Sequence, residues 1–320
     1  GEKVQYDKLL VATGSKPFVP PMKGLDEVED KFTFMTWDSA KAIREKVTAG
    51  TKVLIIGAGL IGLKCAEALH HLDADITVID LADRILPSIL DIRAGEIMQK
   101  HIEDKGTRFI LGTSVEQFSK NSAKLTNGDT VDFDIVVVAV GVRPNTELVS
   151  DAGGKVEKGI ITDLHQQTTI ENVYAAGDCT VSHDCSSDTD RILALLPNAF
   201  MQGEVAGKNM AGEETLYLNA IPMNAIGFYG LHIITAGSYD GDEDITEDAD
   251  KEIYKKLVFK DGLLKGFILM GDVARAGIYT SMIKEQIPLT EVDLDLLREK
   301  PQMMMFGKAR REEKLAGKKH

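Results

Sequence analysis

The 320-residue sequence predicts an α/β protein with parallel sheets, followed by a separate α+β domain. Three observations support this fold class. Apolar strands alternate with segments of helical periodicity between residues 51 and 104, a pattern typical of a parallel α/β unit. A continuous apolar run at 135–141 indicates a strand buried on both faces. Beyond residue 218, neighbouring apolar runs joined by turn residues indicate an antiparallel sheet.

The first part of the chain contains the parallel strands and their helices. A strand from residue 9 runs into a Gly/Pro turn at 14–17. The elements expected after it are a helix at 37–49, a strand at 52–56, a helix at 59–72, a strand at 75–79, a helix at 92–104, strands at 108–118, 123–125, 131–132 and 135–141, and two short strands within 159–178.

A helix at 198–211 closes the first part, and the second part follows from residue 218. After it we expect a strand at 225–236, an acidic loop at 239–250, strands at 254–260 and 263–270, and helices at 274–285 and 291–299. The pair Asp261-Gly262 between two apolar runs indicates a hairpin turn. The segment Met303–Phe306 is expected to lie in the core.

Composition and charge restrict the partners. The formal net charge of −13 disfavours a nucleic-acid partner, because phosphate binding needs a basic surface. The absence of an uninterrupted run of ~18 apolar residues argues against a membrane span, so we expect a soluble, cytoplasmic protein. The four C-terminal lysines expected to form a solvated tail are Lys308, Lys314, Lys318 and Lys319.

The cysteines and acidic clusters do not predict a metal or disulfide site. The three cysteines, Cys65, Cys179 and Cys185, are scattered, and Cys179 is expected to pack as a small apolar residue. The acidic run from Asp240 resembles a calcium loop but has Ile245 where such a loop needs glycine. We therefore predict no metal site.

A glycine-rich turn follows the strand at 52–56 and opens a helix. Its pattern, Gly57-x-Gly59-x-x-Gly62, in this context predicts a dinucleotide-binding turn. Gly57 permits the tight turn, Gly59 lets a pyrophosphate approach the backbone, and Gly62 lets helix and strand pack closely. The helix N-terminus supplies N–H donors for the phosphates.

An acidic residue, Asp80, ends the next strand, eighteen residues after Gly62. At this place a carboxylate can accept both ribose hydroxyls and repel a 2′-phosphate. Leu81 follows it, with no adjacent base to receive that phosphate, although Arg84 lies nearby. The sequence therefore favours NADH over NADPH.

Further motifs occur in a fixed order along the whole chain. They are Ala12-Thr13-Gly14 after a strand, the glycine turn, Ile85-Leu86-Pro87, Gly141-Val-Arg143-Pro144-Asn145 and Tyr174-Ala-Ala-Gly177-Asp178. In this order the sequence resembles the flavoproteins of the pyridine-nucleotide-disulphide oxidoreductase type. The segment 196–203 and the C-terminal hairpins are most similar to NADH oxidases, rubredoxin reductases and the NADH-dehydrogenase modules of nitrite reductases.

The resemblance implies a Rossmann-like NAD(H) domain inserted in a partial FAD-binding domain. The implied FAD segments are 1–22 and 149–212, the NAD(H) domain is 23–148, and 213–320 form an α+β interface domain that commonly supports a homodimer. The family's first strand and its own glycine turn would precede Gly1, so the FAD domain is expected to lack its N-terminal part.

The resemblance also implies which residues contact the cofactors. Asp178 would accept a hydrogen bond from a ribityl hydroxyl of FAD, and the backbone at Gly177 would meet its pyrophosphate. The other residues assigned to FAD are Ala12, Thr13, Gly14, Pro197 and Asn198. The residues assigned to NADH beside the glycines and Asp80 are Leu60, Ile61, Lys64 and Gly141, with Ile61 near the nicotinamide.

The implied activity is hydride transfer from NADH to FAD, followed by electron transfer to an acceptor that the sequence does not identify. No catalytic side chain is assigned, because the two cofactors carry this reaction. Lys64 stands where many relatives have Glu, and it is interpreted either as a charge that stabilises reduced flavin or as a surface lysine.

Two alternatives remain open. The chain could be a flavin-free NAD(H) dehydrogenase or NADH sensor, or a non-catalytic fragment or scaffold subunit that needs another chain to complete its FAD site.

Overall fold

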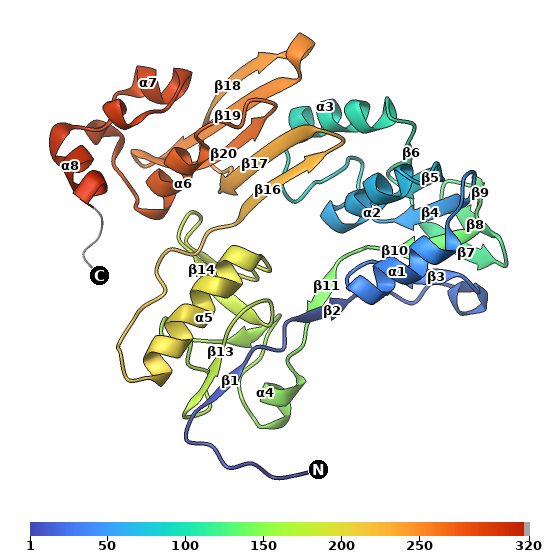
Figure 1. Cartoon of the computed structure of the whole chain (residues 1–320), viewed down its shortest axis with the longest axis horizontal. Helices are drawn as coiled ribbons and strands as arrows, with labels where there is room; N and C mark the ends of the chain where they lie inside the picture. Colours follow the sequence, from blue (N-terminus) through green and yellow to red (C-terminus); the bar gives the residue numbers. More distant parts are fainter. Residues whose placement is uncertain (317–320) are drawn as a thin grey trace. The chain divides into compact units, whose positions relative to one another are not determined.

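The computed structural model describes residues 1–316 and divides into two compact units. The inserted unit consists of Lys16–Arg143 and Gly227–Leu231. The flanking unit consists of Gly1–Ser15, Pro144–Ile226 and the chain from His232 onward. Figure 1 labels most of the elements named below.

The inserted unit is built around a parallel sheet of five strands in the order β3-β10-β4-β5-β6. A second, antiparallel sheet has the order β7-β8-β9. The elements of this unit are η1 (Leu25–Glu27), β3 (Lys31–Thr33), α1 (Trp37–Lys46), β4 (Lys52–Ile56), α2 (Leu60–His70), β5 (Asp75–Ile79), α3 (Ile92–Glu103), β6 (Arg108–Ile110), β7 (Val115–Ser119), β8 (Ser122–Leu125), β9 (Thr130–Asp132) and β10 (Ile135–Val138).

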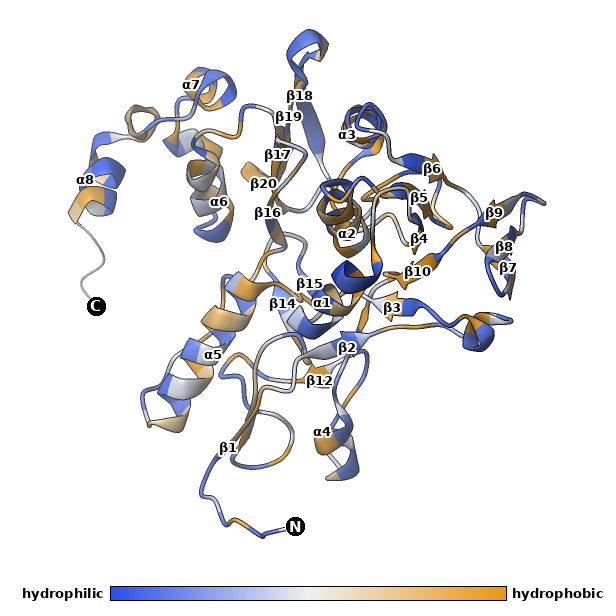
Figure 2. Cartoon of the chain, turned by 45° about the vertical axis from the view of Figure 1, so that its right-hand side comes forward, coloured by the Kyte–Doolittle hydropathy of each residue, from blue (hydrophilic) through white to orange (hydrophobic). Residues whose placement is uncertain are grey.

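The central strands of the parallel sheet are apolar on both faces. Every residue of β10 is buried, and the strand pairs in parallel with β3 and β4 (Figure 2). This confirms the predicted central strand, but the strand ends at Val138, not at Gly141. Gly141, three residues further on, has φ of +121°, a backbone conformation that favours glycine, and the short β11 (Val142–Pro144) begins after it.

The segment predicted as one strand at 108–118 forms two strands in different sheets. β6 ends at Ile110 and β7 begins at Val115. Gly112, with φ of +68°, lies between them and donates its N–H to Ala82 O at 2.8 Å. The prediction was wrong here because an apolar run does not show where the chain leaves one sheet for another.

The three helices of the inserted unit are confirmed, with earlier C-terminal ends than predicted. Thr36 and Ser39 form a capping box at the start of α1, and Asp91 accepts the N–H of Ala94 at the start of α3.

Two short strands, β2 (Ser15–Pro17) and β11, pair where the chain passes from one unit to the other.

The flanking unit contains a parallel pair β1-β13, a sheet β12-β14-β15 and, apart from Gly227–Leu231, a five-stranded antiparallel sheet β16-β17-β20-β19-β18. Its elements are β1 (Leu9–Val11), α4 (Glu147–Asp151), β12 (Ile160–Ile161), β13 (Val173–Ala175), β14 (Thr180–Asp184), β15 (Thr189–Arg191), α5 (Leu196–Met210), β16 (Met223–Phe228), β17 (Leu231–Gly237), β18 (Asp242–Asp248), η2 (Ala249–Lys251), β19 (Ile253–Lys260), β20 (Leu263–Met270), α6 (Ala276–Lys284), η3 (Leu289–Glu291), α7 (Leu294–Glu299), η4 (Met303–Met305) and α8 (Lys308–Ala316).

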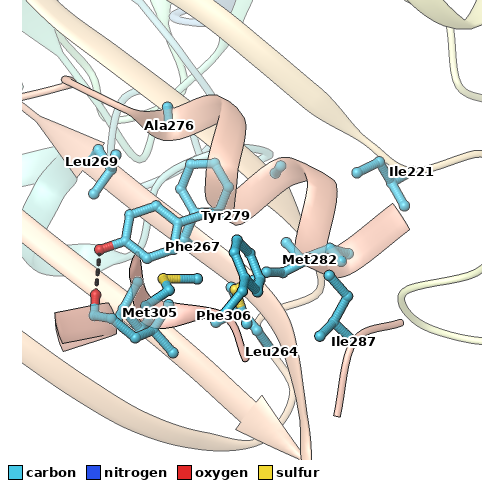
Figure 3. Packing of buried hydrophobic residues seen from close by; sticks show 14 residues of the cluster. Ile221, Leu264, Phe267, Leu269, Ala276, Tyr279, Met282, Ile287, Met305 and Phe306 are labelled. Atoms are coloured by element: carbon cyan, nitrogen blue, oxygen red, sulfur yellow. Dashed lines mark hydrogen bonds between the residues drawn. The ribbon is translucent and has the colours of Figure 1, made fainter. Parts of the chain in front are cut away.

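The antiparallel sheet packs against α6 and the C-terminal segments. Figure 3 shows Phe267 and Tyr279 in this core, with ring centroids 5.4 Å apart. The Tyr279 hydroxyl donates to Leu297 O at 2.8 Å. Met305 and Phe306 are buried in the same cluster, as predicted for 303–306, whereas Met304 is 64% exposed.

The strand predicted at 225–236 is a hairpin. β16 and β17 are joined by Tyr229 and Gly230, which have φ of +50° and +90°. Two consecutive left-handed residues are the geometry of a two-residue hairpin turn. The prediction missed this turn because Tyr rarely adopts that conformation.

The predicted acidic loop at 239–250 contains an edge strand. β18 pairs with β19 along its whole length and appears as a hydrophilic strand in Figure 2. Cations neutralise its carboxylates: Glu243 pairs with Lys256 at 2.5 Å and Asp244 with Arg298 at 2.7 Å. The loop prediction was wrong because these cationic partners, on β19 and α7, are distant from the acidic run in sequence.

The C-terminal lysines are only partly a solvated tail. Lys308 is exposed at the start of α8, whereas Lys314 donates to Ser281 Oγ at 2.8 Å and pairs with Glu285 at 2.9 Å. The side chain of Lys314 is 17% exposed, so the prediction is wrong for this residue. Lys318 and Lys319 lie outside the described residues.

Candidate functional site

The glycine turn connects β4 to α2, and its three glycines differ in the space around them. A Cβ on Gly62 would lie 1.9 Å from Gly57 O, and one on Gly57 would lie 2.4 Å from Ala139 O. A Cβ on Gly59 would meet no heavy atom within 4 Å. Positions 57 and 62 therefore have no room for a side chain, while the backbone at Gly59 is open to a ligand. This spacing fits a bound pyrophosphate.

Asp80 lies directly after β5 and holds the backbone on two sides. Its Oδ2 accepts the N–H of Ala58 at 2.6 Å, and its Oδ1 accepts the N–H of Ala82 at 2.7 Å. One carboxylate thus braces both the glycine turn and the loop that follows β5. Each oxygen has a further lone pair, so the side chain can still accept ribose hydroxyls.

The other residues assigned to NADH surround the same end of the parallel sheet. Leu60 and Ile61 form the start of α2, where both are half-buried. Gly141 follows β10, the neighbour of β4, and Gly141 O accepts the N–H of Phe18 at 2.9 Å. The carboxyl ends of adjacent parallel strands therefore bring Gly57, Asp80 and Gly141 to one edge, the usual ligand-binding edge of such sheets.

Lys64 lies on α2 two residues after Gly62, and its ammonium is paired. Its Nζ donates to Glu67 Oε2 and to Gly227 O, each at 2.5 Å. It also lies 5.1 Å from the centroid of the Phe228 ring. The ammonium is thus held by a carboxylate, a carbonyl and an aromatic face, all within the inserted unit.

The residues assigned to FAD lie in the flanking unit, at the ends of β1 and β13. These strands pair in parallel with Val11 opposite Ala175, so Ala12–Gly14 and Gly177–Asp178 leave the sheet at the same edge. Thr13 Oγ1 donates to Asn145 O at 2.7 Å, and Asn145 Nδ2 donates to Thr13 O at 2.9 Å. These two hydrogen bonds hold the loop Ala12–Gly14 in place.

The loop Gly177–Asp178 is held in place by two side chains from other segments, Ser15 and Gln202. Ser15 Oγ donates to Asp178 Oδ2 at 3.1 Å. Gln202, a buried residue of α5, accepts the N–H of Gly177 through Oε1 at 2.6 Å. Sequence reasoning assigned no role to Asn145 or Gln202, although both lie in motifs quoted for the resemblance. Their side chains act on backbone groups that are far away in sequence.

Pro197 and Asn198 stand at the start of α5 and have different environments. Pro197 is exposed in the first turn, where a proline costs no hydrogen bond. The side chain of Asn198 is fully buried, donates to Ile221 O at 3.0 Å and accepts from Tyr217 OH at 2.9 Å. Its amide is therefore committed to the protein interior, a role that the sequence did not predict.

Cys65 and Cys185 are not activated thiols. Burial raises the pKa of Cys65 to about 12 and raises the pKa of Cys185 as well. Cys179 is fully buried in an apolar cluster, which confirms the predicted packing role. Within residues 1–316, no group of three or more His, Cys, Asp or Glu side chains is placed to hold a metal ion.

The parallel sheet, the glycine turn and the acid after β5 are the combination of features found in dinucleotide-binding α/β proteins. Residues 1–203 match the family described as pyridine nucleotide-disulphide oxidoreductase, and residues 222–287 match the rubredoxin NAD+ reductase C-terminal domain. The chain belongs to the pyridine nucleotide-disulphide oxidoreductase family. FAD and NADH, the cofactors predicted from the sequence, are those of this family.

Similar proteins include curated relatives and solved structures. The epsilon subunit of an NADH-dependent phenylglyoxylate dehydrogenase from Aromatoleum evansii is 33% identical over 91% of this chain and 71% of its own length. An NADH oxidase from Methanocaldococcus jannaschii is 37% identical over 67% of this chain. The structure of a water-forming NADH oxidase from Lactobacillus brevis, bound to NADH, matches with a TM-score of 0.83 at 25% identity, over 90% of this chain and 70% of that one.

The chain spans only part of these relatives, 49% in the case of the Methanocaldococcus jannaschii enzyme. Among residues 1–316, none of the helices has the length and apolar character needed to cross a bilayer.

Proposed function

We propose that this protein is an FAD-dependent NADH oxidoreductase that transfers hydride from NADH to FAD and electrons onward to a separate acceptor. The observation that carries the proposal is the glycine turn, in which Gly59 is open while Gly57 and Gly62 leave no room for a side chain. A turn with this distribution of space, followed by Asp80, supports binding of a dinucleotide.

In the proposed NADH site, the chain contributes donors, shape and charge. Backbone N–H groups at the start of α2 would face the pyrophosphate, helped by the partial positive charge of the helix N-terminus. Asp80 would accept the ribose hydroxyls of the adenosine half. Its charge would disfavour the 2′-phosphate of NADPH, and the neighbouring Leu81 is 76% exposed and uncharged.

In the proposed FAD site, the two loops after β1 and β13 supply the contacts. Asp178 is half-buried and would accept a hydroxyl of the ribityl chain, while Ser15 and Gln202 hold the loop in place. When bound, FAD would supply the group that accepts the hydride. The residues of this chain position the cofactors and exclude water, and no side-chain acid or base is needed for the transfer.

The direct test is anaerobic reduction of flavin by NADH. The purified chain is incubated with FAD, freed of unbound cofactor, and mixed with NADH while the flavin absorbance near its visible maximum is followed. Retained FAD that bleaches on addition of NADH supports the proposal. Retained FAD that NADH does not reduce would contradict it. The acceptor is then sought by adding dioxygen, a disulfide or an iron–sulfur protein to the reduced chain.

A second candidate is an NADH-binding chain that completes its FAD site only with another polypeptide. The observation that favours it is the sheet holding Ala12–Gly14 and Gly177–Asp178, in which β1 and β13 are the two paired strands within the described residues. Parallel sheets of so few strands bury little backbone. NADH binding without retention of added FAD would favour this candidate. A homodimer formed through residues 213–320 and a cytoplasmic location stay predictions, and light scattering tests the first.

A further inference from the structure

The second and third turns of α2 carry a side-chain network that the proposed cofactor contacts do not explain. Glu67 accepts Lys64 Nζ through Oε2 at 2.5 Å and the backbone N–H of Tyr229 through Oε1 at 2.6 Å. Lys64 Nζ also donates to Gly227 O at 2.5 Å. Both members of this ion pair thus bind the backbone of the turn 227–231, which belongs to the inserted unit.

Tyr229 is held at its remaining polar atoms by other residues of the same unit. His101 Nε2 lies 3.3 Å from Tyr229 O, and Thr107 Oγ1 lies 3.3 Å from the Tyr229 hydroxyl. The ring of His70 meets the Tyr229 ring edge-on, with centroids 5.2 Å apart. A hairpin turn usually leaves such groups to water, so this degree of side-chain pairing marks the turn as a bound element.

The carboxylate of the pair is largely covered, and the ammonium is partly exposed. The side chain of Glu67 is 19% exposed and that of Lys64 is 39% exposed. A cation close to a helix N-terminus is unfavourable toward the helix dipole, and here Glu67, Gly227 O and the Phe228 ring offset that cost. The network therefore differs from an ordinary surface ion pair, which contributes little.

We infer that Lys64, Glu67 and Tyr229 form a clasp that couples the glycine turn to the turn 227–231, with Lys64 and Glu67 acting as positioning residues for the dinucleotide. The inference rests on the proposed NADH site. The N–H groups proposed to face the pyrophosphate and the two clasp side chains lie on one short helix, Leu60–His70. A helix as short as α2 moves as a rigid unit. Contacts that hold Lys64 and Glu67 therefore also fix the first turn of α2 in place before the dinucleotide binds.

The coupling is reciprocal, because a clasp that favours NADH binding must itself be stabilised by bound NADH. Amide hydrogen exchange of the full chain measures this at the N–H of Tyr229. In the wild type, saturating NADH should slow that exchange about 5-fold or more. A residue with a purely structural role would not make this exchange depend on NADH.

The variants Lys64→Met and Glu67→Gln should each speed exchange at Tyr229 without NADH and raise the NADH dissociation constant about 5- to 10-fold. The double variant should bind NADH about as weakly as the weaker single variant, since both remove one network. Lys64→Arg keeps a cationic donor and should retain most of the coupling.

The matched control is Lys41→Met. Lys41 pairs with Asp38 three residues away on α1, and the two side chains are 50% and 89% exposed. The Lys41→Met variant should change neither the exchange rate at Tyr229 nor the NADH dissociation constant. NADH binding that leaves exchange at 227–231 unchanged, or variants that bind NADH as the wild type does, would overturn the coupling alone. A wild type that binds no NADH would overturn the proposed function together with it.

Discussion

Asp80 Oδ2 accepts the backbone N–H of Ala58 at 2.6 Å, so the acid after β5 reaches into the glycine turn after β4. Its other oxygen accepts the N–H of Ala82 at 2.7 Å. The residue predicted to select the dinucleotide therefore also shapes the loop that receives it. Hydrogen bonds to a charged acceptor are stronger than those between neutral groups, so the two roles are energetically linked.

Replacing Asp80 should change both affinity and selectivity. Asp80→Ala is expected to weaken NADH binding about 10- to 100-fold, because two backbone N–H groups lose a charged acceptor and the ribose loses its partner. NADPH should be affected less, because repulsion of its 2′-phosphate is also lost. Titrating the protein with NADH and, separately, with NADPH, while nicotinamide fluorescence is followed, measures the ratio of the two affinities. Asp83→Asn, which changes an exposed neighbouring carboxylate, is the control, and an unchanged NADH-to-NADPH ratio in Asp80→Ala would refute the selector role.

Two glycines of the same turn should separate stability from binding. Gly62→Ala places a methyl group 1.9 Å from Gly57 O and should lower the free energy of unfolding by about 2 kcal/mol or more. Gly59→Ala meets only open space and has an ordinary negative φ, so it should leave stability nearly unchanged while reducing NADH affinity at least 10-fold. Urea unfolding and NADH titration on both variants check this. Equal losses of stability would contradict the assignment.

The flavin loop gives a prediction about FAD retention. Asp178→Ala removes the proposed acceptor for the ribityl chain and should lower FAD affinity about 10-fold or more, with little effect on NADH binding. The measurement is flavin absorbance retained after gel filtration. Asp163→Ala, at an exposed turn of the same unit, should retain as much FAD as the wild type. FAD retention that is insensitive to Asp178 would place the cofactor elsewhere.

The buried thiol of Cys65 should make stability depend on alkaline pH. Burial raises its pKa from 9.0 to about 12, so above pH 9 the unfolded chain loses a proton that the folded chain keeps. The stabilisation is complete below pH 9 and is lost as the pH rises toward 12, with a slope of up to about 1.4 kcal/mol per pH unit. Cys65→Ala should reduce this slope. Urea midpoints between pH 8 and 10.5 test it, and parallel curves would show that the thiol ionises normally.

The site residues show how far local sequence reasoning extends. The roles predicted for Gly57, Gly59 and Gly62 follow from a strand, a spacing and a helix that are contiguous in the chain, and the space around each glycine is compatible with the predicted role. Gln202 and Asn145 were missed because their partners, Gly177 and Thr13, are brought to them by the pairing of β1 with β13 and the packing of α5.

Charged and polar side chains were the least predictable part. Asn198 and Lys64 are assigned to cofactors from their motifs, and these assignments stay predictions. The structure adds two internal partners for the amide of Asn198 and two acceptors for the ammonium of Lys64, which the motifs do not indicate. The acidic strand β18 was read as a loop for a similar reason. A polar side chain can form its hydrogen bonds with any suitable group nearby. The local sequence does not show which groups the fold will bring close to it.

The sequence by itself determined the class of fold and the family, and it located the glycine turn and the acid proposed to select the dinucleotide, because these depend on hydrophobic periodicity and on backbone geometry encoded over short stretches. Only the tertiary structure decided which strands share an edge, which turn receives the ion pair of α2, and which acids are neutralised. These depend on contacts between distant segments, where burial and pairing choose among partners that are equivalent in sequence.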